Sequence, residues 1–584
     1  MGIWRGAGGR MMDRMAARSA VRRPVATRFT RPPEPRQIGL ITRGQQLVAG
    51  EFLFSGLRLR DRTTSIWTVA KTHPQVADEI HACLWLDDLA AFGTEAAHAR
   101  ARAWVLAWID KHGAARGGEG WAVPVAARRL TRWIDHGDMI LRRLDPREAE
   151  RFMSSLGQQA RFLARRAQAL PRGPQRFEAL AAAIHAGLAL TGADGALPGL
   201  VKALTRDCDV MIDPQGALAS RNPEALLTLL GQLISVREDL RTAGRDIPLP
   251  LEGAIARIAP VLRGLRHADG ALPRFHGGGR GVAGRLDAAL LAAGPRATPG
   301  AGPHMGYLRL AAGRTTLIAD AARPPAAAAN PEGHASTLAF EVTSGRRPVI
   351  VSSGSGVRFG PEWQAAARST AGHSALSVGG ASSSRVGGRS QAKLGTGGLT
   401  FRPKLVRGEV PSVGDAPGTE RGLNLSHDGY RASHGLTHAR QLRLTSDGRC
   451  LSGEDHLVCE TQKDRATLDA ARKLAGPGGL GFQIRFHLHP DVKPQIHDDG
   501  RLVEMRLPSG ETWVLRQEGA ERMALAPSAY LETGALSPRP TQQVVLTGRA
   551  MAYANRVRWT LAKAADTPDA LRDLVMAEDP DLTG

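Results

Sequence analysis

Two histidines in the second half of the chain, His334 and His373, have the residue type and the setting of a chemical site. Each lies among small residues, next to segments that alternate apolar and polar positions. Such alternation is typical of β-strands, and it allows the two imidazoles to meet across a sheet. Because imidazole is a zinc ligand, the pair is a candidate metal site. The alternative is that backbone and hydroxyl groups satisfy both histidines inside a β-sandwich.

A further cluster of polar side chains lies in the segment SHDGYRASHGLTHARQL, residues 426–442. Its Tyr430 and His438 are residue types that act as the acid and the base in proton transfer. His487 and His489 alternate along a strand-like run, a spacing that metals accept. The alternative for the whole cluster is a set of polar groups on the surface.

Trp121, Arg128, Arg132 and Trp133 lie in the segment WAVPVAARRLTRWIDHGD, residues 121–138. An indole stacks on a sugar face, and a guanidinium pairs with a carboxylate through two hydrogen bonds. These four residues are therefore candidate contacts for an acidic sugar. The alternative is an ordinary amphipathic helix, in which Arg128 and Arg132 share one solvated face.

Arg274 and His276 belong to the Gly-rich segment RHADGALPRFHGGGRG, residues 266–281. Its glycines free the backbone to approach a ligand closely. We interpret the segment as an interdomain linker that lines a cleft and contacts substrate through Arg274 and His276. A plain flexible linker is the alternative.

The chain changes its hydrophobic period once, near Gly294. From about residue 45 to residue 293, apolar residues recur at i, i+3 and i+4 in successive segments separated by short turns, which indicates amphipathic helices packed as a bundle or α/α toroid. After Gly294, short alternating runs and turns such as Ser-Asp-Gly indicate antiparallel strands. We therefore predict an incomplete α/α toroid over residues 41–293 and an antiparallel β-sandwich over residues 300–565.

The ends of the chain and its composition limit the compartment and the partners. Residues 1–40 are predicted to be a disordered basic leader without the apolar segment of a secretory signal, which favours a cytoplasmic protein, and residues 566–584 a C-terminal tail. No apolar run has the length of a membrane span. The formal charge of +21 invites a polyanion, although a coding bias toward Arg is an equal explanation. No nucleic-acid-binding module is present, so we expect no nucleic acid partner.

Three motifs in the β-rich half resemble the C-terminal domain of the heparinase II/III family of polysaccharide lyases. They are HASTLAFE, IVSSG and RSTAGHS, at residues 334–341, 350–354 and 368–374. The resemblance implies a helical toroid followed by a β-sandwich, the same order that the periodicity indicates. It also implies activity on uronic-acid-containing glycans and a place in the periplasm or cell envelope.

The resemblance further implies that His334 and His373 are zinc ligands together with a carboxylate that lies between them in sequence. This chain has Ser352 at the carboxylate position. A site with two histidines and no third protein ligand binds zinc weakly, unless Glu332 or Glu341 replaces the missing ligand. We therefore expect that no cofactor is required and that any zinc is held weakly.

Lyase chemistry by β-elimination requires a group that neutralises the uronate carboxylate and a Tyr or His to move protons. The resemblance implies an Asn-His pair and a Tyr from the toroid, but every Tyr here follows the helical half, and Glu332 stands where the family has a catalytic His. For a lyase, the remaining candidates are Arg128 or Arg132 as neutraliser and Tyr430 or His438 as proton carriers.

Two functions remain open from the sequence. The first is a polysaccharide lyase acting on acidic glycans. The second is a catalytically degenerate member of the family that binds an anionic glycan or an envelope polymer. The oligomeric state is left open.

Overall fold

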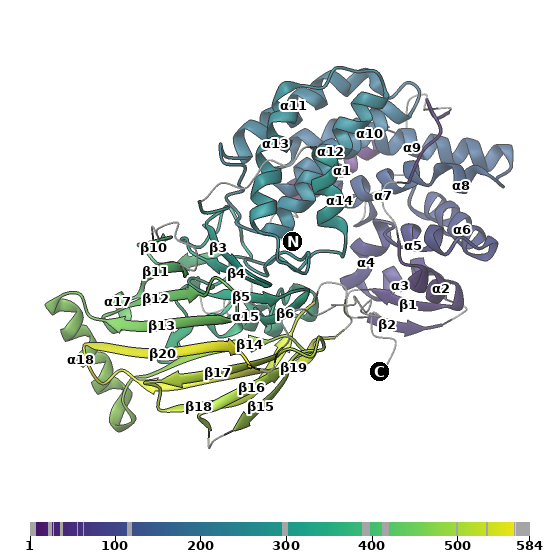
Figure 1. Ribbon diagram of the computed structural model, residues 1–584. Helices are drawn as coiled ribbons and strands as arrows, with labels where there is room; N and C mark the ends of the chain where they lie inside the picture. Colours follow the sequence, from purple (N-terminus) through teal and green to yellow (C-terminus); the bar gives the residue numbers. More distant parts are fainter. Residues whose placement is uncertain are drawn as a thin grey trace. The chain divides into compact units, whose positions relative to one another are not determined.

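The computed structural model (Figure 1) describes residues 7–20, 26, 28–35, 39–54, 57–61, 64–113, 119–294, 302–387, 397–411, 420–497, 500–532, 535, 537–565 and 567. The chain divides into two compact units. Residues 1–213 and 228–256 form the first, called the helical unit, and residues 214–227 and 257–584 form the second, called the sandwich unit. Each unit is described by itself.

The helical unit consists of helices and one short β-hairpin. The hairpin is made of β1 (Glu51–Phe54) and β2 (Leu57–Arg60). The helices are α1 (Ala7–Ala20), α2 (Ile41–Ala49), α3 (Ile66–Thr72), α4 (Pro74–His81), α5 (Trp85–Phe92), α6 (Glu95–His112), α7 (Val123–Asp135), α8 (Gly137–Leu141), α9 (Pro146–Arg166), α10 (Pro174–Ala189), α11 (Leu197–Met211), α12 (Pro223–Thr242) and α13 (Leu249–Gly264), of which the last two extend into the sandwich unit.

Local sequence signals explain why these helices begin where they do. At α9, Asp145 and Glu148 form a capping box, in which each side chain accepts from the backbone N–H of the other residue, and Pro146 occupies the first turn. The apolar residues of α9, such as Phe152, are buried on one face. None of the described helices combines the length and the apolar character that crossing a membrane requires.

The leader is ordered where the structure describes it, which corrects the prediction of disorder. Residues 7–20 form α1, and Asp13 pairs with Arg166 of α9 at 2.7 Å. The backbone N–H of Thr30 donates to the carbonyl of Ala189 at 2.9 Å. These bonds fix the segment against the helical unit, which an amino-acid composition rich in Arg, Gly and Pro does not reveal. The C-terminal tail, apart from Thr567, lies outside the described residues.

The sandwich unit contains two large antiparallel sheets. The first has the strand order β10-β11-β12-β13-β20-β17-β16-β15, and the second the order β18-β19-β14-β6-β5-β4-β3, with β7 paired to β14. Phe340 of β5 stacks on Trp559 of β20, with ring centroids 5.6 Å apart, so the inner faces of the two sheets pack directly together. The prediction of helices followed by an antiparallel β-sandwich is confirmed.

The strands of this unit are β3 (Tyr307–Ala312), β4 (Thr315–Asp320), β5 (Phe340–Ser344), β6 (Arg347–Val351), β7 (Leu376–Val378), β8 (Arg385–Val386), β9 (Leu399–Phe401), β10 (Val406–Glu409), β11 (Arg421–Tyr430), β12 (Leu436–Leu444), β13 (Cys450–Val458), β14 (Gly481–Leu488), β15 (Lys493–His497), β16 (Leu502–Arg506), β17 (Thr512–Glu518), β18 (Arg522–Tyr530), β19 (Arg539–Arg549) and β20 (Ala554–Lys563). Helix α14 (Arg285–Ala292) precedes these strands, and helices α15 (Pro361–Arg368), α17 (Arg431–His434) and α18 (Gln462–Ala475) lie between them in sequence.

Two segments that the sequence assigns to the helical half belong to the sandwich unit. They are residues 214–227 and residues 257–293. The reason is long-range hydrogen bonding: Arg221 and His276 both bond to residues of the β-rich half. This arrangement places them in the polar network that forms the candidate site.

Candidate functional site

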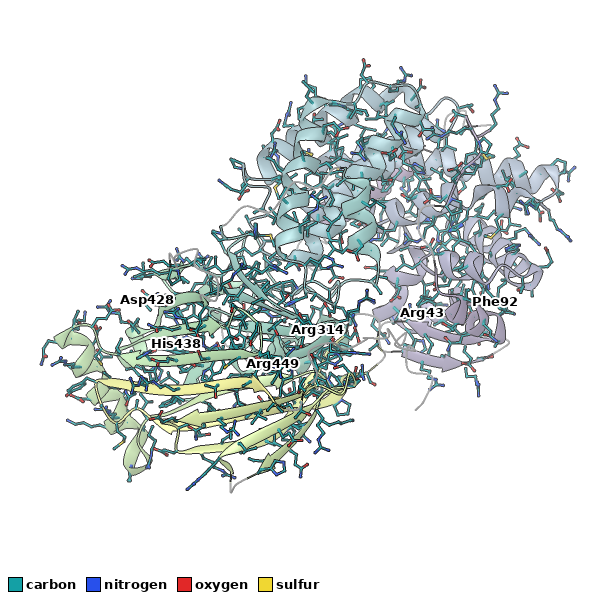
Figure 2. All side chains as sticks on the ribbon, viewed as in Figure 1. Arg43, Phe92, Arg314, Asp428, His438 and Arg449 are labelled. Atoms are coloured by element: carbon teal, nitrogen blue, oxygen red, sulfur yellow. The ribbon has the colours of Figure 1, made fainter. Side chains whose placement is uncertain are left out.

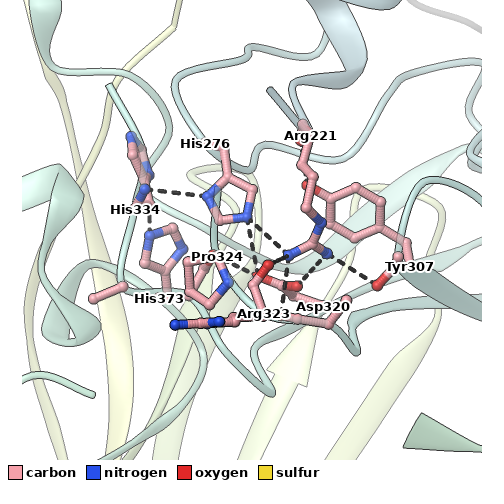
Figure 3. A network of polar contacts seen from close by, with 12 residues as sticks. Arg221, His276, Tyr307, Asp320, Arg323, Pro324, His334 and His373 are labelled. Atoms are coloured by element: carbon pink, nitrogen blue, oxygen red, sulfur yellow. Dashed lines mark hydrogen bonds and ion pairs between the residues drawn. The ribbon is translucent and has the colours of Figure 1, made fainter. Parts of the chain in front are cut away.

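The centre of the candidate site is an ion pair between Arg221 and Asp320, the last residue of β4 (Figure 3). Nη2 of Arg221 donates to Oδ1 of Asp320 at 2.6 Å, and the same guanidinium donates to the carbonyls of Met305, Gly306, Ala322 and Arg323. Gly306 makes this possible, because a Cβ there would lie 2.8 Å from Nε of Arg221. The arginine thus ties the 214–227 segment to β3 and β4.

His276 connects this ion pair to the histidine pair predicted from the sequence (Figure 3). Nδ1 of His276 accepts the backbone N–H of His334 at 3.1 Å. In the neutral imidazole the proton therefore lies on Nε2, which faces Oδ2 of Asp320 at 3.4 Å. Burial by itself would raise the pKa of Asp320, but Arg221 and His276 hold it below its ordinary value.

His334 and His373 meet as the sequence predicted. Nδ1 of His334 and Nε2 of His373 lie 3.1 Å apart, within hydrogen-bonding distance. Burial lowers the pKa of both histidines, that of His373 to about 3, with neighbouring histidines adding to the effect. Both imidazoles are therefore neutral at ordinary pH. Nδ1 of His373 is buried and has no partner among the described residues.

The residues around this pair do not fit a zinc ion held by three protein ligands. Ser352, at the position of the implied carboxylate, is fully buried and offers only a hydroxyl. Glu341 accepts the backbone N–H groups of Arg274 and Ser352, at 3.1 and 3.0 Å. Glu332 accepts from Gln364 instead. Within the described part of the chain, no three His, Cys, Asp or Glu side chains are grouped so that they could hold a metal.

The network is buried. Its members are His276, His334, His373, Asp320, Tyr307 and Arg221, and the most exposed of them, Arg221, is 8% exposed. Neutral imidazoles can move protons, but the substrate must reach them. In this arrangement the groups join segments that are distant in sequence.

Arg274 and His276 are not in a flexible linker. His276 is fully buried and has a left-handed backbone with φ of 52°, and Arg274 is 4% exposed. The guanidinium of Arg274 lies over the ring of Tyr530, 4.3 Å from its centroid. The segment is ordered because side chains such as His276 and Arg274 are buried inside the sandwich unit, which the glycine content conceals.

Tyr430, the last residue of β11, and His438, near the start of β12, are also buried and do not lie in a surface loop. Figure 2 labels His438 in the sandwich unit. The hydroxyl of Tyr430 donates to the carbonyl of Leu376 at 2.7 Å, and Nε2 of His438 bonds to Asp455 at 2.7 Å. The two side chains make no hydrogen bond with each other, and the ring of His427 contacts both. The structure therefore brings them near one another, but within the core.

In the helical unit, the four residues expected to contact sugar have partners of their own. Trp121 and Trp133 are buried, and both rings contact Trp108. Arg128 forms two hydrogen bonds to Glu178, and Nε of Arg132 donates to Asp87 at 2.8 Å. The tryptophans thus belong to an aromatic core, and each arginine is neutralised by a carboxylate.

Sequence reasoning missed the charged partners of these histidines. Asp320 and Asp455 each pair with a buried arginine, Arg221 and Arg440. Arg440 also donates to two backbone carbonyls in the segments that follow His334 and His373. A carboxylate directly after the apolar run Leu317–Ala319, as in TLIAD, was the available signal for Asp320.

The arrangement of helices and sheets is that of heparinase III. The structure matches a crystal structure of heparinase III with a TM-score of 0.64 and 13% identity, covering 96% of this chain and 90% of that chain. It matches heparan sulfate lyase HepC from Pedobacter heparinus with a TM-score of 0.52 and 12% identity, covering 96% of this chain and 90% of that chain. At these identities the likeness shows the fold alone.

Sequence similarity gives the family. Residues 294–560 match the family model described as heparinase II/III-like, C-terminal. The chain is also 31% identical to FtsZ-localized protein C of Caulobacter vibrioides (strain NA1000 / CB15N) over 545 residues, which are 91% of this chain and 90% of that protein. The chain belongs to the heparinase II/III-like family, as the three motifs predicted.

Proposed function

We propose that this protein is a heparinase II/III-like protein without lyase activity that works with the FtsZ-based division machinery and binds an anionic envelope glycan. The observation that carries the proposal is the 31% identity to FtsZ-localized protein C along 91% of the chain. That relative is named for its location with FtsZ, and the similarity extends over both units.

The state of the tyrosines supports the absence of lyase chemistry. A base in β-elimination must reach the proton beside the uronate carboxylate and must accept it near neutral pH. Tyr307 and Tyr430 are buried and donate to backbone carbonyls, and burial raises the pKa of both. His438 is held by Asp455. None of these three groups is arranged to take a substrate proton.

The arginines expected to neutralise the substrate carboxylate support the same conclusion. Arg128 is engaged by both oxygens of Glu178, and Arg132 by Asp87. A glycan carboxylate would have to displace a protein carboxylate from each. The formal charge of +21 still favours an anionic partner, which is the reason for the glycan-binding part of the proposal.

Separate experiments test the three parts of the proposal. Purified protein should sediment with FtsZ polymers formed with GTP, and a fluorescent fusion in Caulobacter vibrioides should coincide with FtsZ at the division plane. Incubation with a panel of acidic polysaccharides should release no unsaturated uronate, measured by its absorbance, while binding should weaken as salt rises. Release of unsaturated uronate that is lost in Tyr430→Phe would establish the lyase instead. A fusion spread through the cell and no sedimentation with FtsZ would refute the division role.

A further inference from the structure

A separate group of polar side chains meets at one edge of the sandwich unit, where β14 and β18 end. His489 follows β14, and Tyr530 is the last residue of β18. Their rings contact edge to face, with centroids 4.9 Å apart and an interplanar angle of 82°. The guanidinium of Arg274 lies over the ring of Tyr530, 4.3 Å from its centroid. All three side chains are buried, at 1%, 0% and 4% exposure for His489, Tyr530 and Arg274.

Two hydrogen-bond donors in this group have no acceptor. Nδ1 of His489 accepts the backbone N–H of Asp491 at 3.3 Å, so the proton of the neutral imidazole lies on Nε2. Among the residues that the structure describes, Nε2 of His489 and the hydroxyl of Tyr530 are buried without a hydrogen-bond partner. A buried polar group without a partner is destabilising, so two on neighbouring rings require an explanation.

Charged side chains of both signs surround the two rings. Arg274, Arg280, Arg347 and Arg539 all act to lower the pKa of His489, after burial, which is the larger cause. Carboxylates oppose these four cations: Glu532 lies 3.8 Å from Arg280, and Asp491 lies 3.2 Å from Arg539 and 3.5 Å from Nδ1 of His489. Glu341 and Asp269 act on Arg274. The surrounding charges are therefore mixed, and the reason to expect an anion is that both unpaired atoms are donors beside a guanidinium.

We propose that His489, Tyr530 and Arg274 bind a single oxyanion group, a phosphate or a carboxylate. Such a group accepts several hydrogen bonds at once, and a guanidinium pairs with it through two parallel N–H groups. The imidazole Nε2–H and the phenol O–H supply the two further donors. A metal cation does not suit the site, because it needs unprotonated ligand atoms and would meet the arginines. The inference does not depend on the role at the division plane.

The test compares anions and two matched tyrosine variants of the full-length protein. Thermal unfolding and titration calorimetry are measured with sodium phosphate, with sodium glucuronate, and with sodium chloride at the same ionic strength. Tyr530→Phe removes the hydroxyl but keeps the ring that contacts His489 and Arg274. Tyr553→Phe makes the same chemical change at a half-exposed tyrosine whose hydroxyl bonds to Asp469.

Phosphate or glucuronate, but not chloride, should raise the unfolding temperature of the wild-type protein. Tyr530→Phe should bind the anion about tenfold more weakly, because it loses one hydrogen bond to a charged group, whereas Tyr553→Phe should bind normally. The anion that binds more tightly identifies the ligand group. Arg274→Lys gives an independent measurement of anion binding, since it keeps the positive charge but loses the two parallel N–H groups of the guanidinium.

The proposal is overturned if neither anion shifts unfolding beyond the effect of chloride. It is also overturned if all variants respond equally, because that result would assign the effect to other surface cations. In either case Tyr530→Phe should be as stable as the wild-type protein or more so, since the variant only removes an unsatisfied hydroxyl.

Discussion

Replacing His185 by glutamine should destabilise the helical unit by an amount that depends on pH. His185 on α10 lies between two carboxylates, with Nδ1 3.0 Å from Asp239 of α12 and Nε2 3.1 Å from Asp135 of α7. The contact with Asp135 has the distance of an ion pair but not the geometry of a hydrogen bond. Burial alone would lower the pKa of His185, but the two carboxylates outweigh it and raise the pKa to about 9.

The magnitude follows from the raised pKa. A rise from the ordinary 6.5 to about 9 corresponds to about 3 kcal/mol of unfolding free energy. Because the folded pKa is the higher one, this stabilisation is fully present below pH 6.5 and is lost as the pH rises through about 9. The wild-type protein should therefore exceed His185→Gln by about 3 kcal/mol at acidic pH and by much less in strong alkali.

The assay is urea unfolding followed by helical circular dichroism, which reports mainly on the helical unit, at several pH values. His98→Gln is the control, since this histidine of α6 is less buried and does not lie between two carboxylates. A difference between wild type and His185→Gln that stays constant from acidic to alkaline pH would refute the reasoning. It would mean that the imidazole is neutral in the folded state, and that glutamine removes packing only.

Further substitutions and a metal analysis test the buried ion pair, the histidine pair and the Tyr430 hydrogen bond. Asp320→Asn should lower the unfolding free energy in urea by about 3–5 kcal/mol, because it leaves the Arg221 guanidinium buried without its counter-ion. The control is Asp287, which forms an exposed ion pair, and Asp287→Asn should lower the unfolding free energy by under about 1 kcal/mol. Elemental analysis should find far less than one zinc per chain, and stoichiometric zinc that disappears in His373→Ala would contradict this. Tyr430→Phe should lower the unfolding free energy by about 1 kcal/mol through loss of one buried hydrogen bond; no loss of stability would argue against that bond.

The order of helices and strands was predictable because it depends on local periodicity. A 3.6-residue repeat gives way to a 2-residue repeat near Gly294, and no long-range information is needed to detect the change. The meeting of His334 and His373 was predictable for a similar reason, since both lie beside strands whose alternation fixes the face of the sheet. The three sequence motifs predicted the family.

The partners of these side chains were not predictable. Arg221 and Asp320 are 99 residues apart and belong to segments with different periodicity, so no local pattern connects them. The pattern around Trp121, just before α7, and Trp133, within it, fits both a sugar-binding face and a buried face. In the structure both tryptophans are buried in the core. Burial depends on the packing of the whole unit and not on α7 alone.

The buried histidines show that motifs of this family can have a role in folding. Gly429 donates to Nδ1 of His427, whose Nε2 faces Nδ1 of His438 at 3.3 Å, and Nε2 of His438 bonds to Asp455. His334, His276 and Asp320 repeat this order of backbone N–H, neutral imidazole and carboxylate.

In both of these hydrogen-bonded series the carboxylate also binds a buried arginine. Removal of any one member therefore leaves a buried polar group or charge unpaired. A histidine held in this way is needed for folding, whether or not it ever meets a substrate. Its presence in a family motif is therefore evidence for the fold, and evidence for catalysis must come from groups that a glycan can reach.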